Sequence, residues 1–160
     1  MSGDAAQGEA SFSAEGCTIT TNKGDVIYVT NTTATIYLKN NKFITNDQTG
    51  YFLRIKADSW GNSGSNGGNV TLTADSQEMC GNVAVDSIST LSFTLKNGSS
   101  FEGAINAENS AKQITLALDA SSKLKLTGDC YVTSLSNADS SNSNIDFNGY
   151  KLYVNGTAIN

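Results

Sequence analysis

The sequence contains no proline and no histidine, and its only arginine is Arg54. Without histidine the chain has no imidazole to act as a general base, as a metal ligand or as a pH switch near neutrality. Ser-His-Asp and Cys-His catalytic arrangements are therefore excluded within this chain. Without proline, every residue after the first can donate a backbone hydrogen bond, which suits strands in the interior of a sheet.

Charge is also scarce, because charged residues make up 16% of the 160 residues and the formal net charge is −5. Binding to nucleic acid or to an anionic membrane surface needs clusters of Lys and Arg, so we expect neither partner. No apolar run approaches the ~18 residues that span a bilayer, so we expect no membrane insertion. No cofactor motif is present, and we expect none to be bound.

The three cysteines, Cys17, Cys80 and Cys130, lie far apart, a pattern typical of neither a disulfide framework nor a zinc motif. We expect small core residues with at most one disulfide. The first ten residues, MSGDAAQGEA, have neither the basic nor the apolar region of a signal peptide. The chain is then either cytosolic or, as we expect, a mature domain or an excised segment. We expect residues 1–10 to be flexible and residues 11–160 to form one domain.

The dominant pattern in the sequence is a repeat of short strands with period-two alternation. Apolar positions align between five runs: ATIYL at 34, NVTLTA at 69, TLSFTL at 90, QITLAL at 113 and SNIDF at 143. Five or six residues after the last apolar position of each run comes another apolar residue: Phe43, Met79, Phe101, Leu124 and Leu152. The same spacing from Phe12 to Cys17 predicts an earlier copy of the unit and a core position for Cys17.

A glycine then precedes a second short strand in each unit: Gly24-DVIYV, Gly50-YFLRI, Gly81-NVAV, Gly103-AIN and Gly128-DCYV. No helical pattern connects the units, so equivalent strands are expected to stack in parallel. This order predicts an all-β, single-stranded parallel β-helix (solenoid) of about six coils. A β-sandwich also uses many short strands, but it does not explain why strand, turn and glycine recur in one order. Cys130, beside Val132, is also predicted to lie in the core.

Four stretches carry a resemblance to a known kind of protein: FLRIKADSWGNSGSNGGNVTLTADSQ, VAVDSISTLSFTLKNGSSFEGAIN, LTGDCYVTSL and SNIDFNGYKLYVNGTAI. The chain resembles β-helical repeat segments of large secreted or cell-surface proteins of anaerobic Gram-positive bacteria, often labelled adhesin-like or carbohydrate-binding. The resemblance extends from about residue 17 to the end. The resemblance implies a right-handed parallel β-helix and an extracellular, wall-associated location. It identifies no set of catalytic residues.

The predicted function is a non-enzymatic structural or adhesive segment of an extracellular bacterial protein. An uncapped coil exposes unpaired backbone groups, so we expect it to stack on further coils or end to end with other copies. The alternative is a carbohydrate-binding module that presents an aromatic ring and polar groups to a polysaccharide. Its candidate residues are Trp60, Tyr51, Arg54 and Asn62. The glycine-rich loop around Trp60 lacks the order of a phosphate-binding loop.

A third hypothesis is a polysaccharide lyase or hydrolase, with Arg54 and Lys56 pointing outward from a strand whose inward residues are Tyr51, Leu53 and Ile55. Two carboxylates ~5–10 Å apart would have to flank the scissile bond, and no motif selects such a pair. Asp129, Asp139 and Asp146 are weak candidates for a calcium site, because their spacing matches neither an EF-hand nor a nonapeptide calcium repeat. Thr35, Thr71, Ser92 and Thr115 are predicted to stack in one outward column, which suits water ordering but also ordinary strand propensity.

Overall fold

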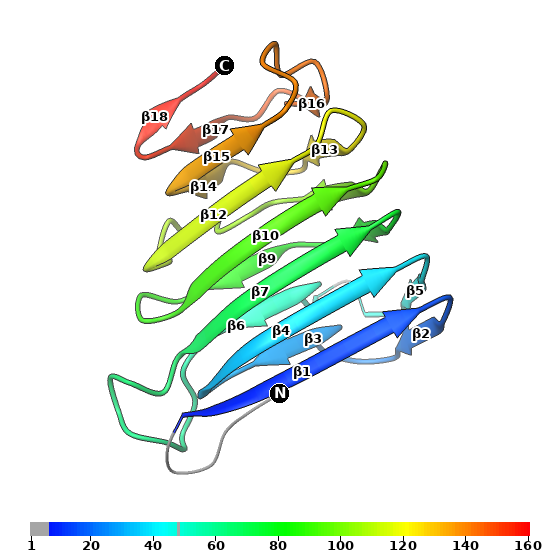
Figure 1. The fold of residues 1–160 in the computed structure, drawn as a ribbon. Coiled ribbons are helices and arrows are strands. Elements are labelled where there is room, and N and C mark those ends of the chain that lie inside the picture. The colour runs from blue at the N-terminus through cyan, green and yellow to red at the C-terminus, as the bar shows by residue number, and fades with distance from the viewer. Residues whose placement is uncertain (1–6, 48) are drawn as a thin grey trace.

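The computed structural model describes residues 7–47 and 49–160, and this part of the chain forms a parallel β-solenoid of about six turns (Figure 1). It contains no helix, and hence none that could span a membrane. The N-terminal strand and the C-terminal strand lie at opposite ends of the stack (Figure 1). β1 begins at Gly8, inside the segment predicted to be flexible.

The first face is a six-stranded parallel sheet with one strand from each turn. Its order is β1 (Gly8–Glu15), β4 (Thr32–Lys39), β7 (Gly68–Asp75), β10 (Thr90–Lys96), β12 (Gln113–Leu118) and β15 (Ser134–Asn137). Ile36 pairs with Leu72, Leu72 with Phe93, and Phe93 with Leu116, as the aligned repeat predicts. Alternate residues therefore form continuous apolar rows inside the solenoid.

The second face is divided into two sheets. The first two turns contribute β2 (Thr18–Thr21) and β5 (Lys42–Thr45), which pair with each other. The later turns contribute β8 (Glu78–Cys80), β11 (Ser100–Gly103), β13 (Lys123–Leu126) and β16 (Ile145–Asp146). No ladder joins β5 to β8 in the described structure, although they belong to consecutive turns.

The third face contains the strands that follow the glycine corners. β3 (Ile27–Val29), β6 (Leu53–Ile55) and β9 (Val83–Val85) form one sheet, and Val83 forms an isolated bridge with Ile105 in the next turn. β14 (Cys130–Val132) and β17 (Leu152–Val154) pair in parallel, and β18 (Thr157–Ala158) pairs antiparallel with β17. The parallel stacking of this face therefore ends in an antiparallel strand.

The interior holds the apolar rows and one polar row. Four aromatic rings contact edge to face in the order Phe43, Phe52, Phe101 and Phe93, with centroids 5.2, 6.4 and 5.4 Å apart. At the corner after the first face, polar side chains bond the backbone of the preceding turn. Asn41 accepts from the Cys17 amide (2.9 Å), Gln77 from the Asn41 amide (2.8 Å), and Ser99 from the Gln77 amide (3.0 Å). This row satisfies amides that the curved backbone cannot pair.

The predicted alignment is wrong in the first turn. Phe12 pairs with Ile36, and Ala14 is the residue that pairs with Leu38. Ile19, and not Cys17, pairs with Phe43. Cys17 is exposed as a result. Cys80, which was also expected in the core, is exposed too, whereas Cys130 is buried as predicted.

The alignment is also wrong in the last turn. The strand paired with β12 is β15, and Leu135 rather than Ile145 continues the row of Leu116. Ile145 pairs with Leu124 on the second face. The run SLSN has a single apolar residue and therefore gives a weak alternation signal.

Candidate functional site

The predicted carbohydrate-binding residues lie at the start of β6 and in the loop that follows it. Trp60 is 43% exposed, and Asn62 beside it is also exposed. Asn66 holds this loop, because its buried side-chain amide donates to the carbonyl oxygens of Asp58 (2.7 Å) and Trp60 (2.9 Å). The Trp60 backbone is thus fixed while its ring faces solvent.

Arg54 lies between two tyrosine rings on the third face. Its guanidinium carbon is 5.6 Å from the ring centroid of Tyr28 and 5.2 Å from that of Tyr51. Nε donates to the Asp25 carboxylate at 2.6 Å, and Nη2 forms an ion pair with the same carboxylate. Arg54 points outward as predicted, but its charge and both rings already have partners within the chain.

The alternation predicted that Tyr51 points inward, and this prediction is wrong. It is half-buried, with its ring near Arg54, whereas Phe52 and Leu53 are both buried. The alternation breaks because Phe52 occupies the corner before β6, where its amide donates to the Asn82 carbonyl at 2.9 Å. Consecutive residues at such a corner can both enter the core.

Tyr28 links this cluster to the loop. Its hydroxyl donates to the Asp58 carboxylate at 2.7 Å. Burial, together with the charge of Asp58, raises the pKa of Tyr28 to about 12, and the same hydrogen bond lowers the pKa of Asp58. A hollow of about 200 Å³ adjoins the cluster and includes Tyr51, Arg54 and Glu108 in its lining. Tyr51 and Arg54 therefore share one hollow, which Trp60 and Asn62 do not line.

The three weak calcium candidates accept hydrogen bonds from the chain itself. Asp129 accepts from the Lys151 amide (2.9 Å), and Asp146 from the Asn148 amide (3.0 Å). Asp139 accepts from the hydroxyl groups of two serines, which lowers its pKa. Residues 7–47 and 49–160 contain no group of three acidic or cysteine side chains arranged to hold a metal ion.

The outer surface of the first face is rich in hydroxyl groups. The pairings place one outward side chain of each turn in a single column: Ser11, Thr35, Thr71, Ser92, Thr115 and Ser134. The column was predicted in four turns and continues through all six. Tyr37 and Ala117 lie in the neighbouring column and interrupt its run of hydroxyl groups.

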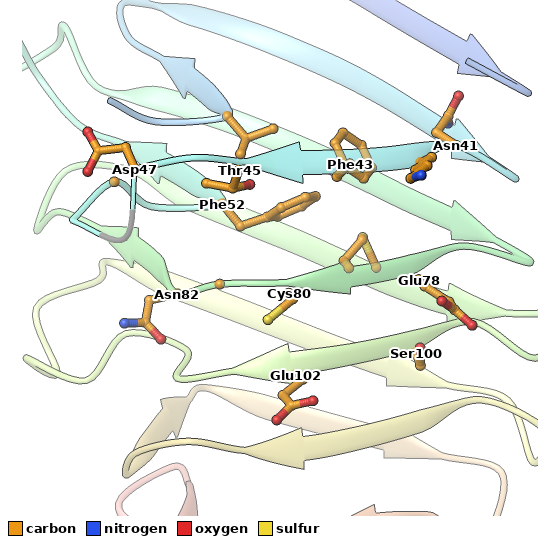
Figure 2. Close-up of a pocket in the computed structure, with 15 residues that line it drawn as sticks. Asn41, Phe43, Thr45, Asp47, Phe52, Glu78, Cys80, Asn82, Ser100 and Glu102 are labelled. Carbon is orange, nitrogen blue, oxygen red and sulfur yellow. The ribbon is translucent and has the colours of Figure 1, made fainter. Parts of the chain in front are cut away.

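A cleft of about 780 Å³ separates β5 from β8 on the second face (Figure 2). It arises from a step in the solenoid. Residues 46–52 connect β5 to β6, whereas Gly81 and Asn82 alone connect β8 to β9. Asp47 accepts from the Gly24 amide at 2.7 Å, so this part of the longer connection bonds to the first turn. The connection bonds to the third turn at its end, where the Phe52 amide donates to the Asn82 carbonyl.

Residues of the first four turns line the cleft, which opens between the second and the third (Figure 2). Phe43, Phe52 and Met79 supply apolar surface, and they belong to or contact the hydrophobic core. Polar and charged side chains surround them: Lys42, Thr45, Asp47, Glu78, Asn82, Ser100 and Glu102. The sequence analysis missed this site, although the unequal lengths of the two connections were a readable signal.

Comparison of the chain with protein-family models, with curated proteins and with solved structures finds no match. The candidate sites are therefore defined by their geometry alone.

Proposed function

We propose that this protein is a non-enzymatic structural or adhesive segment of an extracellular bacterial protein, and that it stacks with further β-coils through β1. The observation that supports this is the open edge of β1, an eight-residue strand whose one partner in the described structure is β4. The extracellular bacterial setting is supported by the resemblance of the repeat sequences alone.

The direction of the backbone groups in β1 follows from its hydrogen bonding to the next turn. The Gly16 amide donates to the Lys39 carbonyl at 3.0 Å. Alternate residues of a parallel strand bond to opposite sides, so the amides of Glu9, Ser11 and Ser13 point away from β4. Such a row of free donors and acceptors is a template for another strand.

A pair of substitutions at one position tests stacking. Ser11→Pro removes an outward N–H without removing a bond to β4, and Ser11→Ala keeps that N–H. We expect the wild type and the alanine variant to self-associate in light scattering, and the proline variant to be monomeric with an unchanged melting temperature. A wild-type chain that is monomeric at high concentration contradicts stacking between copies.

Carbohydrate binding at Trp60 is the second candidate, and the exposure of its ring supports it. Trp60 is the only tryptophan, so its fluorescence reports on this loop alone. We expect soluble cell-wall oligosaccharides to change that emission, and Trp60→Ala to abolish binding in calorimetry. Tyr150→Ala removes an exposed ring elsewhere and should leave binding intact. Equal losses in both variants contradict a site at Trp60.

A further inference from the structure

The split in the second face leaves strand edges on both walls of the cleft. On β5, the amides of Lys42 and Asn46 donate to the first turn, at 2.8 and 2.9 Å. By alternation the N–H and C=O groups of Phe43 point toward the cleft. They have no backbone ladder partner in the described structure, because β5 is the last strand of its sheet.

The opposite wall shows the same alternation. The Gly81 amide donates to the Glu102 carbonyl at 2.9 Å, and the Ser100 amide to the Gln77 carbonyl at 2.9 Å. The backbone groups of Glu78 and Cys80 therefore point toward β5. The Glu78 carbonyl accepts from the Gln77 side chain at 2.7 Å, which leaves the Glu78 amide and both backbone groups of Cys80 open to the cleft.

The dimensions of the cleft suit a short extended chain. Its volume of about 780 Å³ falls within the ~300–1,000 Å³ of typical ligand sites. β5 and β8, which form the two walls, run parallel to each other. The four residues of β5 span about 13 Å at the usual rise per residue of a strand. Side chains that point inward from such a segment would contact Phe43, Phe52 and Met79.

The charges around the cleft favour a basic ligand. Three carboxylates, those of Asp47, Glu78 and Glu102, and one ammonium group, that of Lys42, belong to its lining. Lys125 forms an ion pair with Glu102 at 2.9 Å, whereas Glu78 belongs to none of the ion pairs among the described residues. Outward side chains of an added strand would lie beside Glu78, where opposite charges attract.

We propose that the cleft between β5 and β8 binds an extended, basic peptide segment of another protein by β-strand addition. The segment pairs with the open backbone groups of Phe43, Glu78 and Cys80, and it alternates apolar and basic side chains. Unpaired ladder groups on two parallel walls favour a polypeptide over a polysaccharide, since a peptide offers donors and acceptors at the strand repeat. This site is separate from β1, and the inference does not depend on the proposed stacking.

The probe is the blocked hexapeptide acetyl-KVKVKV-amide. Its controls are acetyl-EVEVEV-amide and a KVKVKV peptide N-methylated at alternate residues, which loses the backbone donors of one edge. We expect the basic peptide to shift the amide resonances of Phe43, Glu78 and Cys80. Both controls should bind at least about tenfold more weakly.

The exposed cysteines provide a second readout within the same chain. Cys80 belongs to the cleft lining and Cys17 does not, and both are exposed. We expect the bound peptide to slow iodoacetamide modification of Cys80 and to leave that of Cys17 unchanged. Equal protection of both thiols, or resonance shifts confined to β1, overturns the assignment. A glucosamine oligomer that protects Cys80 as well as the peptide overturns the choice of a polypeptide.

A matched pair of charge reversals tests the role of the carboxylates. Glu78→Lys places a positive charge in the cleft, and Glu108→Lys makes the same change at an exposed position outside it. We expect the first variant to bind the basic peptide about fivefold more weakly and the second to bind as the wild type does. Melting temperatures of both variants verify folding, and equal affinities contradict the proposal.

Discussion

The side chain of Gln77 is fully buried, with an exposure of 0%. Its amide group forms hydrogen bonds between the second and third turns, where no backbone ladder joins β5 to β8 in the described structure. Its Oε1 accepts from the backbone amide (2.8 Å) and the side-chain amide (3.0 Å) of Asn41. Its Nε2 donates to the carbonyl oxygens of Asn41 (2.8 Å) and Glu78 (2.7 Å). We predict that Gln77→Ala is strongly destabilising.

The magnitude follows from the groups that this substitution leaves without partners. The backbone N–H and C=O of Asn41 both lose their bonds, and an unsatisfied buried group costs ~1–3 kcal/mol. Water entering from the adjacent cleft offsets part of that cost, so we expect a loss of about 3 kcal/mol. For a chain of this size that lowers the melting temperature by about 6–12 °C.

Gln113 provides the matched control, because it is an exposed glutamine on the first face. Gln113→Ala should change the free energy of unfolding by less than about 0.5 kcal/mol. Urea denaturation and thermal melting measure both variants, and hydrogen exchange should show the loss of protection concentrated in the first three turns, since turns contact only their neighbours. If Gln77→Ala loses no more stability than Gln113→Ala, the bridging role assigned to Gln77 is wrong.

Three further predictions concern packing, pH and thiol chemistry. Gly103→Ala should destabilise the fold by more than about 2 kcal/mol in urea denaturation, because the new Cβ collides with the Gly81 carbonyl oxygen. Hydrogen bonds, led by that from Asn97, lower the pKa of Asp75 to about 2. The stability this gives is present above the unfolded pKa of ~3.9 and is lost as the pH falls toward 2. Melting curves of Asp75→Asn should therefore depend less on pH in that window, and an unchanged dependence contradicts this. Burial raises the pKa of Cys130 to about 11, so alkylation of the native protein should modify the other two cysteines and spare Cys130 until urea is added.

The sequence predicted the middle of the solenoid better than its two ends. Period-two alternation fixes which side of a strand is buried, but a shift by two residues preserves the pattern. Long runs such as the one around Phe93 have neighbours on both sides that settle the register. The first turn has only one neighbouring turn, so the pattern alone did not decide whether Phe12 or Ala14 pairs with Leu38. The last turn has too few apolar residues to be aligned.

The candidate sites were only partly predictable. The outward position of Arg54 follows from alternation, and its exposure and contacts agree with it. The inward position of Tyr51 failed, because a corner residue does not obey the alternation of the strand beyond it. The cleft depends on a difference in length between consecutive connections, and a comparison of strand registers alone does not detect such a difference.

The unlike ends of the solenoid constrain the symmetry of any assembly between copies. β1 offers eight residues at one end, whereas β15 offers four at the other and β18 closes the third face with an antiparallel strand. Head-to-tail contacts would leave much of β1 unpaired, but two β1 edges related by a two-fold axis pair along their full length. Isologous contacts of this kind close after two copies, whereas head-to-tail contacts extend into an open filament. With Ser11 of one copy opposite Ser13 of the other, Glu9 faces Glu15 across the axis, where the Lys39 ammonium that pairs with Glu15 at 2.8 Å offsets the repulsion between the two carboxylates.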